Sequence, residues 1–311
     1  MAIPAAAGYP QYSGNLITPL FSMDLLERFY ASTIYSEISS TEYTGELEQG
    51  GDQITFWREP RVRVRNATKG APIQHDTIES DPVTMTIDQS SEFSIAMSQV
   101  DEFQIQNFPT WKERFLVSAG RELAIAIDGP LMTSMFTSVD PANQGTTAGI
   151  KSQNLNMGTT GAPVAITSAN ITQVFAQVHQ VLDEQNAPTD NRFITLPPAG
   201  VTALRNSDLR AAYLTGLSWS PLTNGKIPDE VMGWTIMKSN LIPQAIDPSV
   251  NLLAYHVVAG VKNATAFAAQ IEQTRVIEDK DDWDRYYQGL TVYGFKVLYP
   301  DALVHLYCTF S

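Results

Sequence analysis

The sequence predicts an α+β fold in which helices and strands are mixed without regular alternation. Three observations support that prediction. Residues 51–98 alternate apolar and polar side chains with the period of two that strands require. Two later segments, 111–128 and 170–188, repeat apolar residues at the spacing of an amphipathic helix. Short strands then come without a helix between each pair, and this order argues against a doubly wound parallel sheet.

The first element is an N-terminal arm, residues 1–50, which is only weakly tied to the rest of the chain. Within it, 21–35 is modestly periodic. Leu25, Leu26, Phe29 and Ile34 are predicted to form a short amphipathic helix.

Residues 51–98 are predicted to form an extended two-stranded ribbon, with 53–65 as its outgoing half and 83–97 as its return. The polar stretch between them, 66–82, exceeds the length of a compact hairpin loop. A lone two-stranded ribbon is marginal in water, so we expect a second copy of the chain to complete it. The residues expected to make this contact are Arg61, Val62, Arg63, Val64 and Arg65 on the outgoing half, and Met85 and Ile87 on the return.

A long helix is expected next. The capping-box pattern Thr110 to Glu113 marks its start, and Gly129-Pro130 is expected to end or bend it. Its apolar stripe consists of Trp111, Phe115, Ala119, Leu123 and Ile127.

A second helix begins after Asn170 and is closed by Pro188, and its buried face is predicted to hold Ile171, Val174, Phe175, Val178 and Leu182. Strands are then predicted at 192–196, 234–237 and 252–261, before two closing strands at 291–299 and 304–310.

Composition narrows the class of protein. The chain has 311 residues, of which 43% are hydrophobic and 17% charged, as is ordinary for a globular protein. No apolar run is long enough for a membrane span, and no secretory signal is evident at the start, so synthesis in the cytoplasm is expected. The net charge of −13 lacks the cationic surplus that tight winding around nucleic acid needs. The net negative charge would suit the wall of a container that repels packed DNA phosphates. A need for solubility alone would explain the charge equally well.

No catalytic, cofactor-binding or metal site is predicted. His75, His179, His256 and His305 are far apart, and the single cysteine, Cys308, excludes a multi-cysteine metal site. We expect His179 to be structural, and His256 and His305 to be packed or hydrogen-bonded rather than reactive.

The densest acidic run is 278–284, but it fails the calcium-loop pattern, because Asp284 and Leu290 stand where glycine and glutamate are needed. A looser cation site, or a polysaccharide-acting enzyme using these carboxylates, stays open. A solvated or interface face is the default interpretation.

The order of these parts resembles the major capsid proteins of tailed bacteriophages, which have the Hong Kong 97-like (HK97-like) fold. The segments that support the resemblance are "GDQITFWREPRVRVRNATKGAPI" (51–73) and "VTMTIDQSSEFSIAMSQVDEFQ" (83–104). Further similarity lies in 192–207 and 224–243, and in 266–306 with its "VYGFKVLYPDAL".

The resemblance implies five regions: an N-terminal arm (1–50), an extended loop (51–98), a peripheral domain with the spine helix (99–165), an axial domain (166–289), and the closing strands of the peripheral domain (290–311).

The resemblance also implies a function. Copies would form pentamers and hexamers of an icosahedral virion shell that encloses a double-stranded DNA phage genome without sequence-specific binding. A separate scaffolding protein, a portal and a decoration protein are the expected partners. Some members of the family cross-link a loop lysine to a neighbour's asparagine. Lys69 is a candidate by position, but no matching asparagine is found, so cross-linking is not predicted.

The arginine row of the extended loop is expected either to meet acidic surface on a neighbouring copy, including Glu278, Asp279, Asp281 and Asp282, or to form a solvated face. The alternative function is an encapsulin-like protein compartment of the same fold, which would hold a cargo and no genome.

Overall fold

The computed structural model describes residues 30–43, 52–59, 64, 66, 69, 75, 82–105, 108–207, 230–279 and 283–310. The helices are α1 (Tyr35–Ile38), α3 (Gln99–Gln104), α4 (Phe108–Thr137), α5 (Ile171–Glu184) and α6 (Pro198–Arg205). Short 3-10 helices are η1 (Pro141–Asn143), η3 (Lys262–Ala264) and η4 (Pro300–Ala302). The strands are β1 (Gln53–Trp57), β2 (Pro82–Thr86), β3 (Gln89–Ser98), β4 (Val164–Ile166), β5 (Arg192–Leu196), β6 (Glu230–Val231), β7 (Trp234–Lys238), β8 (Gln244–Ile246), β9 (Leu253–Val261), β10 (Thr265–Glu278), β11 (Asp284–Val297) and β12 (Leu303–Phe310).

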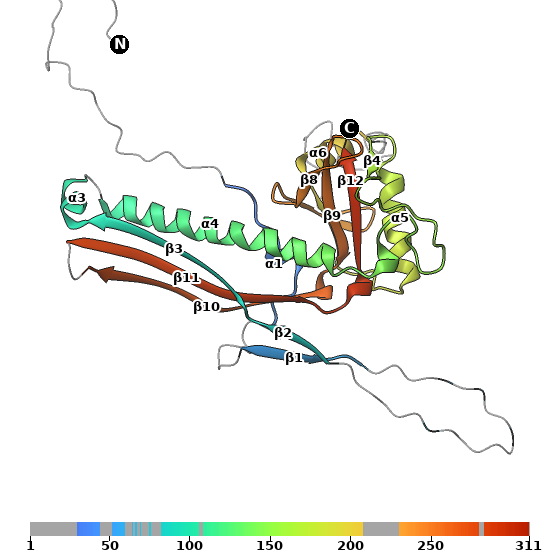
Figure 1. Cartoon of the computed structure of the whole chain (residues 1–311), viewed down its shortest axis with the longest axis horizontal. Helices are drawn as coiled ribbons and strands as arrows, with labels where there is room; N and C mark the ends of the chain where they lie inside the picture. Colours follow the sequence, from blue (N-terminus) through green and yellow to red (C-terminus); the bar gives the residue numbers. More distant parts are fainter. Residues whose placement is uncertain are drawn as a thin grey trace, which may run out of the picture.

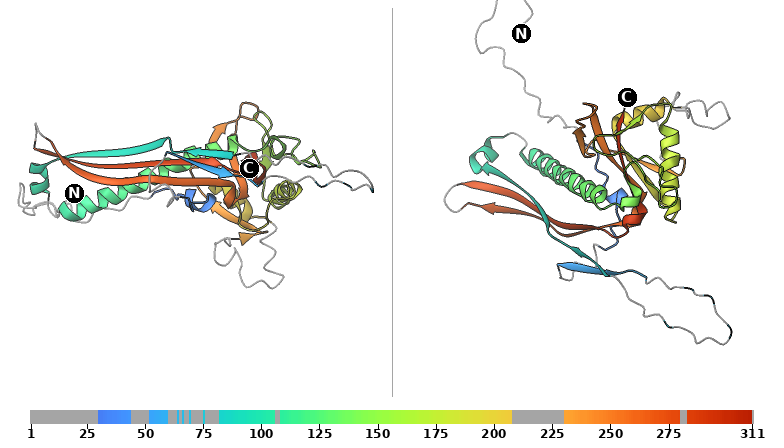
Figure 2. Two further views of the ribbon diagram at one scale, coloured as in Figure 1. Left: turned by 90° about the horizontal axis from the view of Figure 1, so that it is seen from below. Right: turned by 45° about the vertical axis from the view of Figure 1, so that its right-hand side comes forward.

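One half of the molecule is a long antiparallel sheet in the order β10-β11-β3, with α4 lying along it (Figure 1). Alternation along β10 gives this sheet two different faces. Phe267 packs with Ile127 of α4, whereas its neighbours Ala266 and Ala268 contact the ribbon β1–β2. Figure 2 agrees, because α4 and the ribbon lie on opposite faces of the sheet.

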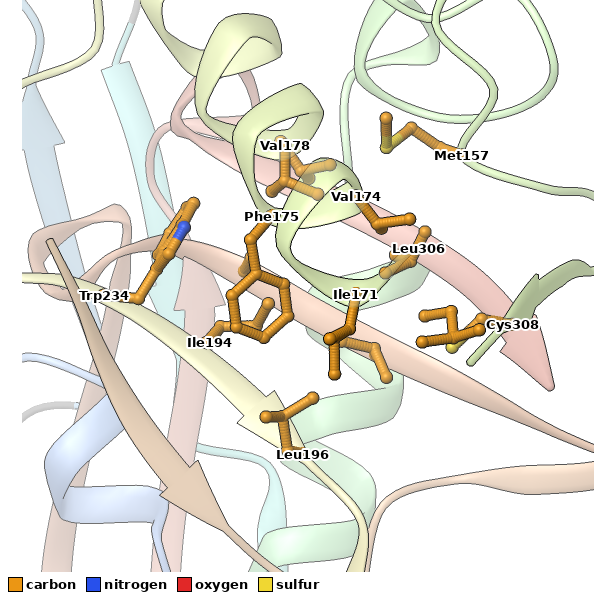
Figure 3. Packing of buried hydrophobic residues seen from close by; sticks show 14 of the residues in the cluster. Met157, Ile171, Val174, Phe175, Val178, Ile194, Leu196, Trp234, Leu306 and Cys308 are labelled. Carbon is orange, nitrogen blue, oxygen red and sulfur yellow. The ribbon is translucent and has the colours of Figure 1, made fainter. Parts of the chain in front are cut away.

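The other half is a seven-stranded sheet, counted within the described residues, in the order β4-β12-β9-β5-β7-β6 with β8 paired to β9. Helices α5 and α6 cover one face, where Ile194 and Leu196 of β5 pack against them (Figure 3). Phe193 of the same strand points to the opposite face and joins Leu131 and Met135 of α4. The sheet is thus buried on both sides, and the second half of α4 belongs to its core.

Local predictions for the second helix and the strand after it are confirmed. Helix α5 buries all five of the predicted apolar residues, and β5 covers the predicted range 192–196. These segments were predictable because their apolar spacing matches the element they form.

The predicted end of the long helix is wrong. Pro130 lies inside α4, which continues to Thr137. A proline removes one hydrogen bond and strains the preceding turn. Leu131, Met132 and Met135 directly after it are fully buried, so tertiary packing holds the helix together beyond the proline.

The ribbon prediction needs a correction. Among the ribbon residues that the structure describes, only β1 and β2 pair with each other, and the return breaks after Thr86. The second part of the return, β3, pairs with β11 of its own chain over Asp284↔Ser98 to Tyr293↔Gln89. Phe93 and Ile95 of β3 thereby line the space under α4. A free two-stranded arm would have no such apolar surface to cover them.

Two domain boundaries are also corrected. The closing strands lie in different sheets, β11 in the long sheet and β12 in the seven-stranded sheet, so residues 290–311 are not one unit. Residues 265–289, assigned to the axial domain, form β10 and the first part of β11 in the long sheet. The alternating pattern of a strand does not say which sheet the strand joins.

The N-terminal arm is anchored over its described part, residues 30–43. Ile34 and Ile38 are buried against α4, and the backbone N–H groups of Ile34 and Tyr35 donate to the carboxylate of Asp128 at 2.9 and 3.0 Å. Ser40 forms a parallel bridge with Ala266 at the start of β10.

Candidate assembly surfaces

The base of the ribbon is fixed to the body of its own chain. Met85 is fully buried beside Ala266 and Leu298. Arg58 donates a hydrogen bond to the carbonyl oxygen of Leu298, and its guanidinium lies 5.7 Å from the ring centre of Tyr299. The expectation that a second copy buries Met85 is therefore wrong, because β10 already supplies the apolar surface.

Gly294 of β11 allows the ribbon to cross the sheet at close range. A Cβ at this position would lie 2.5 Å from the carbonyl oxygen of Thr86 and 2.9 Å from the Cα of Ile87. Ile87 itself is half-buried against the same apolar cluster as Met85. Glycine is needed here for close approach of two backbones, and this requirement was not evident in the sequence.

Beyond its base, the ribbon is exposed wherever it is described. Val64 is 92% exposed, and Trp57 at the end of β1 is 72% exposed. Lys69 lies exposed in a turn. The predicted contact residues Arg61, Val62, Arg63 and Arg65 lie outside the described residues. Their contact with a second copy stays a prediction.

The far end of the long sheet is braced by an ionic network. The guanidinium of Arg285 donates to Glu102 of α3 and to Glu278 of β10, both at 3.0 Å. The hydroxyl of Tyr287 donates to Glu102 at 2.7 Å. Burial, together with this hydrogen bond to a carboxylate, raises the pKa of Tyr287 to about 12. The network fixes α3 to the end of the sheet.

The predicted acidic contact residues divide into two groups. Glu278 is engaged by Arg285, and Asp279 accepts a hydrogen bond of 2.7 Å from the hydroxyl of Tyr286. Asp281 and Asp282 lie outside the described residues.

Large apolar side chains are exposed on this braced end. Phe103 of α3 is 90% exposed, Trp283 is 76% exposed and Val100 is 56% exposed. The backbone N–H of Gln99 donates to the carbonyl oxygen of Trp283 at 2.9 Å, so both segments are held in one place. Exposed aromatic side chains on a rigid support are typical of a protein–protein contact.

His179 has a structural role. Arg192, which is 2% exposed, donates to Asp183 at 2.7 Å and to Nδ1 of His179 at 2.9 Å. Nε2 of His179 is then the donor to the carbonyl oxygen of Met232, at 2.8 Å. Burial lowers the pKa of His179. The network ties α5 to β5 and to the β6–β7 turn, as expected for a hydrogen-bonded rather than reactive histidine.

His256 and His305 also pack within the structure. Nδ1 of His256 lies 3.0 Å from Nε2 of His305, and the ring of Phe136 stacks on His256 with centres 4.3 Å apart. Burial lowers the pKa of both rings, to about 4 for His305. Cys308 is buried, which raises the pKa of its thiol. Within the described ranges, no three acidic, histidine or cysteine side chains gather as metal ligands.

Neither a protein-family model nor a curated protein sequence matches this chain. Solved structures match over nearly its whole length. The structure of Mycobacterium phage Che8 is 22% identical, with 94% of this chain and 97% of that chain covered and a TM-score of 0.73. The capsid of the cyanophage P-SCSP1u is 17% identical, covering 96% and 94% with a TM-score of 0.69. The mature capsid of bacteriophage PhiM1 is 14% identical, covering 94% and 92% with a TM-score of 0.66.

The chain has the HK97-like fold. The α+β class and the long spine helix, α4, predicted from the sequence are confirmed. This chain shares the fold with the Che8 structure over 94% of its length, a span that takes in the long sheet and the seven-stranded sheet. In the part of this chain that the structure describes, no helix has both the length and the apolar character to cross a membrane.

Proposed function

We propose that this chain is the major capsid protein of a tailed bacteriophage. Copies assemble as pentamers and hexamers into an icosahedral shell that encloses a double-stranded DNA genome. The observation that carries the proposal is the mutual coverage with phage structures: 94% of this chain matches 97% of the Che8 chain, and 96% matches 94% of the cyanophage capsid chain.

The shape of the molecule supports this proposal. The ribbon leaves the body on the face of the long sheet opposite α4, and α3 caps the far end of that sheet (Figures 1 and 2). Each of these projections carries an exposed aromatic residue, Trp57 on the ribbon and Phe103 on α3. Different patches on the two sides of a subunit favour head-to-tail contacts, which close into rings.

The ribbon is proposed to lie across a neighbouring copy. Arg61, Arg63 and Arg65 would face acidic surface there. Because Glu278 and Asp279 already have partners in their own chain, we assign the contact to the adjacent Asp281 and Asp282. Exposed ion pairs contribute only about 0–1 kcal/mol each, so they would set the register of the contact. Apolar burial, at about 25 cal/mol per Å², would supply most of the cohesion, multiplied over many copies.

Electron microscopy of the purified protein, alone and with a co-expressed scaffolding protein, tests the function. Closed icosahedral particles are the expected result. A protein that stays a lone monomer in both conditions would refute the proposal. Particles that hold a protein cargo and no nucleic acid in their native host would indicate the encapsulin-like compartment instead.

Two variants test the ribbon contact. Deletion of 60–81 keeps β1 and β2, and reversal of Arg61, Arg63 and Arg65 to glutamate keeps the length of the ribbon. Both should lower particle yield while the subunit stays folded, and a triple lysine variant is the matched control because it keeps the charge. Complete shells of unchanged stability from the deletion variant would rule out the ribbon as a clamp between subunits.

A further inference from the structure

A pocket of about 400 Å³ lies at the end of helix α5. Its walls belong to the loop 185–191 that follows α5, to the segment 261–264 around η3, and to the segment 299–302 around η4. Ligand pockets in proteins occupy about 300–1,000 Å³. The pocket is therefore large enough to hold a small ligand or a side chain of a partner protein.

The loop wall is fixed by hydrogen bonds to its backbone. The backbone of Asn186 is left-handed, with a φ of 59°, and its N–H donates to the carbonyl oxygen of Asp183 at 3.0 Å. The side chain of Arg192 donates to the carbonyl oxygens of Pro188 and Ala187, at 2.8 and 2.9 Å. Because these bonds hold the loop in place, the wall is formed before a ligand binds.

The opposite wall is fixed as well. The N–H of Tyr299 donates to the carbonyl oxygen of Ala264 at 3.1 Å, and the N–H of Ala302 donates to the carbonyl oxygen of Tyr299 at 3.1 Å. The N–H of Lys262 donates to the carbonyl oxygen of Asn191 at 3.2 Å and so connects the two walls. A ligand would thus meet a preorganised site.

The charge of the pocket favours a cation. Asp190 and Asp301 line it, both are exposed, and neither carboxylate is paired with another described residue. Among the described lining residues there is no lysine, arginine or histidine. Helix α5 also ends at this pocket without a basic residue in its last turn, and the C-terminal end of a helix attracts cations. The ligand is therefore expected to carry a positive charge.

Tyr299 favours a planar cation. Its side chain lines the pocket and is 46% exposed. The guanidinium of Arg58 does not line this pocket. It lies 5.7 Å from the ring centre of Tyr299, where both residues line a second hollow at the base of the ribbon. A guanidinium stacks on an aromatic ring more readily than an ammonium does, because it is planar and more weakly hydrated.

The rest of the lining suits an arginine side chain. The side-chain oxygens of Asn186, Asn191 and Asn263 add hydrogen-bond acceptors to the two carboxylates. The remaining lining is mostly apolar and consists of Ala187, Pro188, Val261, Ala264 and Ala302. An arginine matches both parts, because it has five N–H donors at the end of an apolar stem.

We propose that this pocket binds the side chain of an arginine presented by a partner protein. The guanidinium donates to Asp190 and Asp301 and stacks on Tyr299, while the stem covers the apolar lining. Arginine is enriched at protein–protein interfaces and among the few residues that supply most of their binding energy. The proposal does not rest on the proposed shell, since the pocket is complete within one subunit.

Binding of capped amino acids to the full-length, unassembled protein tests the class of ligand. The probe is N-acetyl-L-arginine amide, which represents an arginine inside a polypeptide. The neutral control is N-acetyl-L-citrulline amide, which has nearly the same shape. Dissociation constants are measured by ligand-observed NMR, and the two carboxylates should make arginine bind about tenfold tighter than citrulline.

Two outcomes of this titration would contradict the proposal. An arginine probe that binds no tighter than citrulline, or not at all, would overturn the cation site. Free L-arginine that binds tighter than the capped probe would overturn the assignment to a partner protein, because the pocket would then recognise a small molecule.

A double variant, Asp190→Asn with Asp301→Asn, tests whether the probe binds in this pocket. It should weaken binding of the arginine probe about tenfold, to the level of citrulline. The matched control, Asp101→Asn with Glu113→Gln, removes the same two charges from exposed positions on α3 and α4 and should leave binding unchanged. Equal effects of the two variants would overturn the assignment to the pocket.

Tyr299→Leu tests the stacking, because it keeps an apolar side chain and removes the ring. The wild type should bind the arginine probe about threefold tighter than N-acetyl-L-lysine amide, and the variant should bind both probes equally. A wild type that binds both equally would overturn the assignment to arginine. A preference for arginine that survives in the variant would overturn the role of Tyr299.

Discussion

Replacing Gly294 by alanine tests whether direct backbone contact holds the ribbon to β11. The new methyl group would lie 2.5 Å from the carbonyl oxygen of Thr86 and 2.9 Å from the Cα of Ile87. Favourable contacts between non-bonded carbon atoms lie at about 3.5–4.0 Å. Both obstructing atoms belong to the backbone, so a change of rotamer cannot relieve the overlap, and the ribbon must move by about 1 Å.

Two routes of relaxation give a similar magnitude. Accepting the overlap within a packed core costs about 1–3 kcal/mol. If the ribbon lifts instead, Met85 loses its full burial, which is worth about 1.5–3 kcal/mol. We therefore expect the free energy of unfolding to fall by about 1–3 kcal/mol in Gly294→Ala.

Denaturant unfolding of the unassembled protein measures this difference, and limited proteolysis of the ribbon shows where it arises. Gly120→Ala is the matched control, because Gly120 lies inside α4 and nothing would approach its added methyl group within 4 Å. The control should gain up to about 1 kcal/mol from helix propensity. Wild-type stability and protease resistance in Gly294→Ala would refute the close crossing.

Two buried titratable groups should make stability depend on pH. The pKa of His305 is lowered to about 4 by burial, so the folded chain binds fewer protons than the unfolded chain between pH 6.5 and 4. The contribution of His305 to stability should fall by up to about 3 kcal/mol as the pH drops through that window, so His305→Phe, which keeps a stacked ring, should lose less stability than the wild type over the same window in unfolding titrations. The sign is opposite at Asp128, because burial raises its pKa from 3.8 to about 6 and the folded chain binds more protons in that range. The contribution of Asp128 to stability should fall by up to about 3 kcal/mol as the pH rises from 3.8 to 6, so the stability of Asp128→Asn relative to the wild type should rise over that range. A variant whose stability depends on pH in the same way as the wild type contradicts the assignment of its group.

The sequence predicted those elements whose buried apolar residues follow the regular spacing of a single helix or strand. The face of α5 was predictable because five apolar residues repeat at helical spacing and one sheet covers them all. The α+β class was predictable from the irregular order of helices and strands.

The predictions that failed concern the partners of strands and the end of one helix. β3 has the alternation of a strand whether it pairs with β2 or with β11, and nothing local distinguishes the two. Gly129-Pro130 was expected to end or bend the long helix, and α4 does not end there, because buried residues on the far side of Pro130 outweigh the local cost. Met85 was correctly expected to need apolar cover, and its own β10 supplies it.

By itself, the sequence determined the buried face of α5 and the range of β5, that the acidic chain carries a row of arginines in its extended loop, and that its parts are ordered as in an HK97-like capsid subunit. Only the tertiary structure decided that β11 and β12 join different sheets, that Gly294 gives the ribbon room to cross, and that a pocket lies at the end of α5. The reason is physical: periodicity is a property of neighbours along the chain, whereas pairing and close approach depend on residues far apart in sequence.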